Sequence, residues 1–334
     1  MRRRAFLLAL LAAPLAQGAE VKYPRVERGV RLRFPRDHGA HPEYRTEWWY
    51  ATGWLQEGAQ ALGFQVTFFR ARSRWESGNP SKFTPRQLLL AHAAIADPRH
   101  GRLRYDQRAA RDALGLAGAA TRTTEVWIDD WRFALERDSY RAQIRARDFV
   151  LELSLRAPGA PLLQGDAGFS RKGHRAEEAS YYYSRPQLAV NGTLDGQRVQ
   201  GTAWLDHEWS SQYLAPEAAG WDWVGLNLQG GKALTAFRIR DRNGGVHYAP
   251  PGVVFTPLKS WRSPRTGVEY PVAMRVAANG QQYDLEPLME DQELDAQASA
   301  GTLYWEGAVR ALQEGREVGK GYLELTGYAQ PMTL

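Results

Sequence analysis

The fold is decided by the stretch YRTEWWYATGWLQEGAQALGFQVTFFR, residues 44–70. Residues 44–55 are rich in aromatic and β-branched side chains, and residues 61–70 alternate between apolar and polar side chains. A period of two is typical of a β-strand, and the polar, glycine-containing segment 56–60 is typical of a hairpin turn. This stretch therefore predicts two antiparallel strands joined by a short turn.

The same pattern continues along the chain, and helix candidates are few and short. Asp195-Gly196 separates two of the candidate strands and is a strong hairpin signal. The connections 72–85 and 157–179 are long, and we expect them to lie over a binding mouth or to be mobile. The prediction is an all-β chain with about fifteen strands, too many for one small barrel. Besides the first two, the candidates are residues 87–96, 126–135, 140–147, 149–156, 181–194, 199–209, 221–228, 233–240, 253–261, 268–276, 281–288, 302–312 and 320–328.

A second copy of the aromatic hairpin is found 173 residues further along the chain. Two interpretations stay open: an internal repeat, or the general likeness of any two amphipathic hairpins. The repeat predicts two tandem barrels that meet in the linker 210–220. The matched pairs are Trp48 with Trp221, Tyr50 with Trp223, Leu55 with Leu228, Gly58 with Gly231, Phe64 with Phe237, and Val66 with Ile239.

Residues 1–19 have the order of a secretory signal peptide, with a basic start, a short apolar run and a small-residue end. Arg3-Arg4 also fits the twin-arginine export pattern. The apolar run is too short to span a bilayer, and no other stretch reaches about 18 apolar residues. We therefore expect a periplasmic or secreted protein that is not an integral membrane protein, with domains at 20–214 and 215–334.

Composition removes several classes of function. The 334 residues contain no cysteine, which excludes disulfides, thiol nucleophiles and iron–sulfur clusters. The formal charge of +6 falls to +3 without Arg2, Arg3 and Arg4, and the remaining basic residues are scattered, so no nucleic-acid partner is expected. The sequence has no Walker loop, H-E-x-x-H, G-x-G-x-x-G or G-x-S-x-G motif.

The polar block GTAWLDHEWSS, residues 201–211, is the main candidate for chemistry. It places Asp206, His207 and Glu208 between Trp204 and Trp209, where loss of water moves the pKa of carboxyl and imidazole groups toward neutrality. Strand alternation puts the two acids on one face, and the histidine with Trp209 on the other. Either this block serves acid/base catalysis, or it is a structural ion-pair network at the interdomain turn.

Two other histidine groups carry weaker signals. His92 stands in an apolar strand, and it is either a satisfied core residue or part of a ligand site. His38 and His41, with Glu43, have a His-x-x-His spacing in a loop, which is a weak metal pattern. No metal or cofactor is therefore predicted.

Five separated blocks in order resemble the AttH-like / carotenoid 1,2-hydratase (CrtC) family. They are FPRDHGAHPEYRTEWWYATGWL (34–55), TFFR (67–70), LAHAAIAD (90–97), YYYSRPQLAVNGTL (181–194) and TAWLDHEWSS (202–211). The resemblance runs from about residue 34 to the C-terminus and implies two tandem lipocalin-like antiparallel β-barrels. It also implies an apolar, isoprenoid or lipid-like ligand, and for the secreted branch a link with an ABC-transporter permease.

The family's hydratases use a His-x-Trp pair, which the resemblance carries onto His207 and Trp209. A Tyr-x-Asp pair is also implicated there, and the nearest counterpart in this sequence is Trp221-Asp222-Trp223, so Asp222 joins the candidates. Ligand contacts are expected from aromatic residues, although these also fill barrel cores. The residues expected to line a pocket are Trp48, Trp49, Tyr50, His92, Tyr182, Trp204, Trp221 and Trp223.

The sequence supports two functions. The first is an exported protein that binds an apolar ligand and acts on it as a hydratase or hydrolase. The second is a carrier that holds such a ligand unchanged for an envelope ABC transporter. An enzyme requires His207 and one of the carboxyls Asp206, Glu208 or Asp222 to converge in one pocket, whereas a carrier requires only an apolar cavity.

Overall fold

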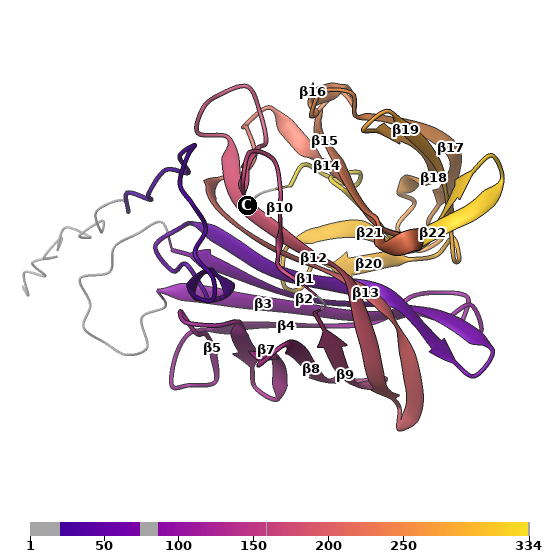
Figure 1. The fold of residues 1–334 in the computed structure, drawn as a ribbon, viewed down its shortest axis with the longest axis horizontal. Coiled ribbons are helices and arrows are strands. Elements are labelled where there is room, and N and C mark those ends of the chain that lie inside the picture. Colours follow the sequence, from indigo (N-terminus) through magenta and orange to yellow (C-terminus); the bar gives the residue numbers. More distant parts are fainter. Residues whose placement is uncertain (1–20, 74–85, 158, 333–334) are drawn as a thin grey trace, which may run out of the picture.

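The computed structural model describes residues 21–73, 86–157 and 159–332, so the predicted signal peptide lies outside the described residues. The chain forms two antiparallel sheets that curl into barrel-like shapes and lie against each other (Figure 1). The all-β prediction and its two lipocalin-like barrels are confirmed. Helical structure in the described ranges consists of two single turns, η1 (Arg36–His38) and η2 (Gln229–Gly231).

The first sheet has 13 strands in the order β4-β3-β2-β1-β13-β12-β9-β8-β7-β6-β5, with β10 and β11 paired to β12. Strands β3 and β4 also approach β5 and β6, which nearly closes the barrel. The strands are β1 (Thr46–Glu57), β2 (Gln60–Arg72), β3 (Gln87–Ala96), β4 (Arg104–Arg111), β5 (Ala117–Ala119), β6 (Glu125–Ile128), β7 (Trp131–Glu136), β8 (Ser139–Arg145), β9 (Val150–Arg156), β10 (Leu162–Leu163), β11 (Phe169–Arg171), β12 (Ala179–Leu194) and β13 (Gln197–Gln212).

The second sheet has 9 strands in the order β16-β15-β14-β22-β21-β19-β18-β17, with β20 paired to β21. The predicted domain division at residues 214 and 215 falls in the connection between β13 and β14. No helix in the described ranges is long and apolar enough to cross a membrane. The strands are β14 (Ala218–Leu228), β15 (Ala233–Asp241), β16 (Val246–Tyr248), β17 (Val254–Arg262), β18 (Glu269–Ala278), β19 (Gln281–Pro287), β20 (Glu293–Ala296), β21 (Thr302–Gln313) and β22 (Arg316–Thr326).

Most of the long predicted strands are confirmed. The predicted single strand 126–135 is wrong, because this segment forms the hairpin β6–β7. The sequence count falls short because of this hairpin, because of β4, which has no alternating apolar pattern, and because of brief strands. The β12–β13 hairpin turns at Asp195 and Gly196, whose φ values of 52° and 79° are those of the predicted tight turn. Strands such as β10 and β11 are too short to show a period. They lie in the connection 157–179, whereas residues 74–85 of the other long connection are outside the described residues.

The repeat holds for its first strand but not for its second. Trp48 and Trp221 both face the junction between the sheets. Phe64, in contrast, lies in the core of the first sheet, whereas its partner Phe237 faces the junction. In β1–β2, Tyr50 pairs with Thr67, whereas in β14–β15 the equivalent Trp223 pairs with Phe237. The second hairpin therefore pairs in a different register, and an odd shift moves side chains to the other face.

The two sheets meet through packed apolar side chains and a few hydrogen bonds. Trp54 Nε1 donates to the carbonyl of Gly321 over 3.0 Å, and Asn227 Nδ2 donates to the carbonyl of Ala203 over 3.0 Å. At Gly63 the sheets are so close that a Cβ would lie 2.7 Å from that of Ala308 and 2.6 Å from the Tyr322 hydroxyl. This glycine therefore sets how closely the two sheets approach.

Gly63→Ala should lower the free energy of unfolding by about 1–3 kcal/mol, because the added methyl group overpacks a closed junction. Denaturant unfolding checks this. Gly159→Ala is the matched control, since a Cβ there meets nothing within 4 Å. Equal unfolding midpoints for the two variants would contradict the close approach.

Candidate functional site

Strand β13 presents the predicted polar block on two buried faces. In its pairing with β1, Glu208 lies opposite Trp48 and Asp206 opposite Tyr50, and these four residues face the second sheet. His207 lies opposite Trp49, and this pair points into the first barrel. The structure therefore separates His207 and Trp209 from the two acids, as strand alternation requires. His207 does not meet Asp206, Glu208 or Asp222 in one pocket, so the convergence expected of an enzyme at His207 is not found, and acid/base chemistry would have to use the carboxyls alone.

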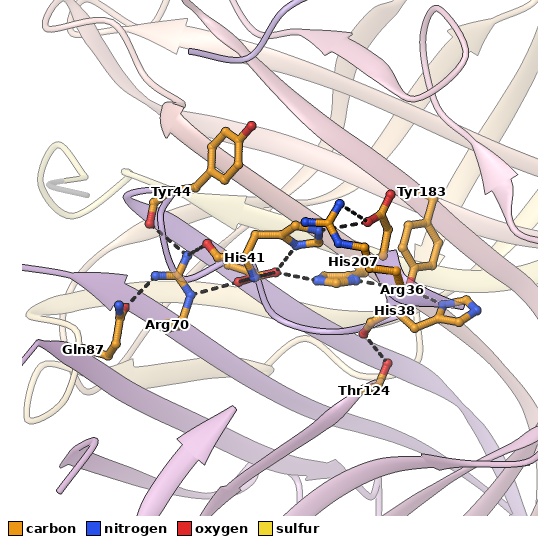
Figure 2. Close-up of polar contacts among 11 residues, drawn as sticks. Arg36, His38, His41, Tyr44, Arg70, Gln87, Thr124, Tyr183 and His207 are labelled. Atoms are coloured by element: carbon orange, nitrogen blue, oxygen red, sulfur yellow. Dashed lines mark hydrogen bonds and ion pairs between the residues drawn. The ribbon is translucent and has the colours of Figure 1, made fainter. Parts of the chain in front are cut away.

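The inner face holds a dense polar network that includes His41, Arg70 and His207 (Figure 2). Oε1 of Glu47 is 2.8 Å from Nδ1 of His41 and 2.9 Å from Nε2 of His207. Its Oε2 accepts a 2.8 Å hydrogen bond from Nε of Arg70. His41 stacks on Trp209 with ring centroids 3.8 Å apart. Each of these groups is buried and has a partner, so the network is rigid.

The positive and negative charges of this network are equal in number when His41 carries a proton. Burial lowers the pKa of His41, but Glu47 and Asp37 outweigh it and raise that pKa to about 9. Burial also acts on Glu47, yet Arg70 and His41 hold the pKa of this carboxyl well below its usual range. Two carboxylates, Asp37 and Glu47, thus meet two cations, His41 and Arg70.

His41, Glu47 and His207 are also the residues that could hold a metal ion, with ligand atoms within 4.8 Å of one another. Since His41 carries a proton and Arg70 already pairs with Glu47, a divalent ion would bring two further positive charges into a neutral, buried cluster. The loop pattern singled out Glu43 instead, but that side chain is exposed and lies outside the network. His38 bonds to Tyr183, 2.9 Å from its hydroxyl.

A cavity of about 190 Å³ lies on the other face, between the two sheets. Its wall is mostly aromatic, and it carries the carboxyl groups of Asp206 and Glu208 from β13 and of Glu324 from β22. Neighbouring rings meet edge to face, with centroids 4.8 Å apart for Trp48 and Tyr213 and 5.3 Å apart for Tyr50 and Trp223. The cavity therefore combines apolar walls with buried acids from both sheets.

The two acids of β13 have different surroundings. Asp206 accepts hydrogen bonds from the Tyr182 hydroxyl (2.7 Å), Trp204 Nε1 (2.6 Å) and the Ser184 hydroxyl. Burial outweighs these donors and raises the pKa of Asp206 to about 7. Glu208 instead pairs with the buried ammonium of Lys172 at 2.8 Å. Burial raises the pKa of Glu208, and Lys172 opposes that rise.

The second sheet contributes two more buried acids. Glu324 and Glu306 stand directly opposite each other on β22 and β21. Glu324 accepts a 2.7 Å hydrogen bond from Trp221 Nε1, and burial raises its pKa to about 7. Glu306 accepts a hydrogen bond from the Tyr50 hydroxyl, and burial with the nearby Glu324 raises its pKa well above the usual range. Opposed carboxyls in an apolar setting favour the protonated form.

The remaining predicted residues lie in four different places. Trp48, Tyr50, His92, Trp221 and Trp223 line the cavity. Tyr182 and Trp204 stand behind it and bond to Asp206, whereas Trp49 lies in the first core. Asp222 points into the second barrel, where Arg238 and Arg240 bind it at 2.6 and 3.0 Å.

His92 is held on both ring nitrogens, 2.6 Å from the Tyr304 hydroxyl and 2.8 Å from the Ser299 hydroxyl. Burial lowers the pKa of His92 to about 3, so its ring is neutral. It is a satisfied residue that also forms part of the cavity wall.

Sequence reasoning missed Lys172, Glu306 and Glu324. The two glutamates carry the signal that drew attention to residues 204–209, an acid inside an apolar strand: YWEG at 304–307 and YLEL at 322–325. Lys172 lies in the connection 157–179 and has no such signal.

His41→Gln should flatten the pH dependence of stability. The folded-state pKa of about 9 lies above the ordinary 6.5, so the proton on His41 stabilises the fold fully below pH 6.5. That contribution is lost as the pH rises through 9. We expect the free energy of unfolding to fall over this range in the native protein and to fall less in the variant.

His100→Gln is the control, because that side chain is half exposed. Parallel stability curves for the native protein and His41→Gln would show that the His41 proton does not support the fold.

Comparison with known proteins gives the family. A family model described as AttH-like matches residues 25–328. The crystal structure of a candidate AttH from Nitrosomonas europaea is 47% identical, with a TM-score of 0.85 over 91% of this chain and 99% of that one. Kievitone hydratase from Nectria haematococca shares the fold, at 15% identity and a TM-score of 0.62 over 94% of this chain and 98% of its own. No curated protein matches the chain. The chain belongs to the AttH-like family.

Proposed function

We propose that this protein binds an apolar ligand with a branched alkene end between its two barrels and adds water across that double bond by acid catalysis. The observation that carries the proposal is the buried acid set on an aromatic wall, where burial raises the pKa of Asp206 and Glu324 to about 7. An acid with a pKa near the working pH both holds and releases its proton efficiently.

Glu324 and Glu208, on opposite walls of the cavity, suit the two proton transfers of a hydration. Glu324 has one neutral donor, Trp221, and serves as the acid. Its proton passes to the less substituted alkene carbon, and the π-electron pair forms the new C–H bond and leaves a tertiary carbocation. Water then attacks this cation and releases a proton to Glu208, the carboxylate paired with Lys172. Exchange with solvent restores both groups. Paired carboxyls in unlike environments commonly divide acid and base roles in this way.

The aromatic wall supports the cationic step. Rings within about 6 Å attract a desolvated cation by roughly 2 kcal/mol or more. The volume also supports a particular size of ligand. An apolar cavity of roughly 150 Å³ holds benzene, so about 190 Å³ suits the branched end of an isoprenoid. The rest of a longer chain extends past Trp48, which is partly exposed.

Glu324→Gln should slow hydration by about 10²–10⁴-fold, the usual contribution of a general acid. The purified protein is incubated with farnesol, and separately with a membrane-lipid extract, and the products are analysed by mass spectrometry. A product heavier by one water, formed by the native protein and lost in Glu324→Gln, supports the proposal.

Glu317→Gln on the exposed end of β22 is the matched control and should keep the native rate. Prenyl compounds that stay bound but unchanged in both the native protein and Glu324→Gln would rule out the hydratase and favour a carrier. Failure to retain any prenyl compound would rule out both for this ligand class.

A further inference from the structure

We infer that the cavity between the barrels binds an organic cation, namely a trialkylammonium group, either free or at the head of an amphiphile. The inference uses the cavity of the proposed function and deepens it by naming a ligand class. It does not need the chemical step, so a protein without hydratase activity would show the same binding.

The carboxyls that line the cavity outnumber the cations that pair with them. The cavity is lined by four carboxyl residues, Glu47, Asp206, Glu208 and Glu324. In the described part of the chain, Glu47 is paired with Arg70 at 2.8 Å and Glu208 with Lys172 at 2.8 Å. The donors to Asp206 and Glu324 are uncharged hydroxyl and indole groups. Buried charges in proteins are normally paired. Asp206 and Glu324 therefore have no ion-pair partner among the described residues, and a cation in the cavity would supply one.

Glu306 brings a further buried carboxyl close to Glu324. Its side chain is fully buried, and Tyr50 donates to Oε1, but Oε2 has no hydrogen-bond partner among the described residues. Glu306 does not itself line the cavity, but Glu324, which does, stands directly opposite it on the neighbouring strand. Two like charges in this position repel each other. A bound cation would relieve that repulsion without requiring either carboxyl to keep its proton.

The aromatic wall decides what kind of cation fits. Trp48, Tyr213 and Trp221 form a continuous series, with centroids 4.8 and 5.5 Å apart in successive pairs, and Tyr50 with Trp223 forms a second edge. Aromatic cages of this type recognise quaternary ammonium groups. Calcium or magnesium would need six or more oxygen ligands, whereas this wall is mostly carbon. A trialkylammonium group is also similar to benzene in size, which suits a cavity of about 190 Å³.

The charge of the wall sets the pH dependence. Asp206 and Glu324 have a pKa of about 7 and lose their protons as the pH rises from about 6 to about 8. A cation should therefore bind more tightly at the higher pH. The other titratable groups do not change charge over this range. Glu47 has a pKa well below its usual range beside Arg70, and His92 is neutral. Glu208 is paired with Lys172, and the pKa of Glu306 and of the wall tyrosines lies well above the usual range (Tyr50, Tyr213, Tyr304).

The test compares choline with its uncharged isostere dimethylbutanol, in which a tert-butyl group replaces trimethylammonium. Dissociation constants are measured on the purified full chain by ligand-observed NMR. At about pH 8 choline should bind at least tenfold more tightly than the isostere, and this preference should shrink at about pH 6. Equal affinities at pH 8, or no binding of choline, would overturn the inference.

Glu324→Gln and Glu306→Gln should each weaken choline binding and leave the isostere unchanged, and Glu317→Gln should alter neither. Two variants are used so that one remains if the other does not fold, which circular dichroism reports. Undiminished choline binding in a folded variant of either residue would place the cation elsewhere and overturn the inference. Hydration of farnesol without choline binding would refute the inference alone. Choline binding with unchanged farnesol would refute the hydratase alone.

Discussion

The pairing of β1 with β13 buries both faces of the same two strands, and this constraint shapes the whole molecule. Residues on one face, such as Trp49 and His207, enter the first barrel, and those on the other, such as Trp48 and Glu208, meet the second sheet. Neither face has bulk water to solvate a polar group, so every polar side chain must find a partner or change its protonation.

Buried polar side chains are stabilised differently on the two faces of β1 and β13. Inside the first barrel, Glu47 has Arg70 and two histidines around it, and its charges are balanced. Between the sheets, the donors to Asp206 and Glu324 in the described part of the chain are uncharged. Charge balance gives a rigid and unreactive core, whereas uncompensated acids have pKa values near neutrality and can exchange protons with a ligand. For this reason we assign structure to the inner face and chemistry to the outer one.

Much of this fold can be predicted from the sequence. The period-two pattern predicts the long strands, and alternation within residues 204–209 correctly separates Asp206 and Glu208 from His207 and Trp209. It cannot say which face holds the cavity, because both are buried and both carry tryptophans. Glu324 and Glu306 come near Asp206 and Glu208 only when the second sheet, which carries β21 and β22, docks on the first. The repeat fails at Phe237 for a similar reason, since the pairing register of a hairpin is set by its turn.

The inner network and the outer cavity are connected through strand register. Glu47 on β1 is bonded to Arg70 on β2 and to His207 on β13, so one carboxylate connects three adjacent strands of the barrel. A slip of one residue would turn every side chain of a strand to the other face, taking the acids of β13 out of the cavity. Because Glu47 precedes Trp48 in the chain, the bonds that hold it also fix the wall residue next to it. The balanced network is therefore what keeps the unbalanced acids in place.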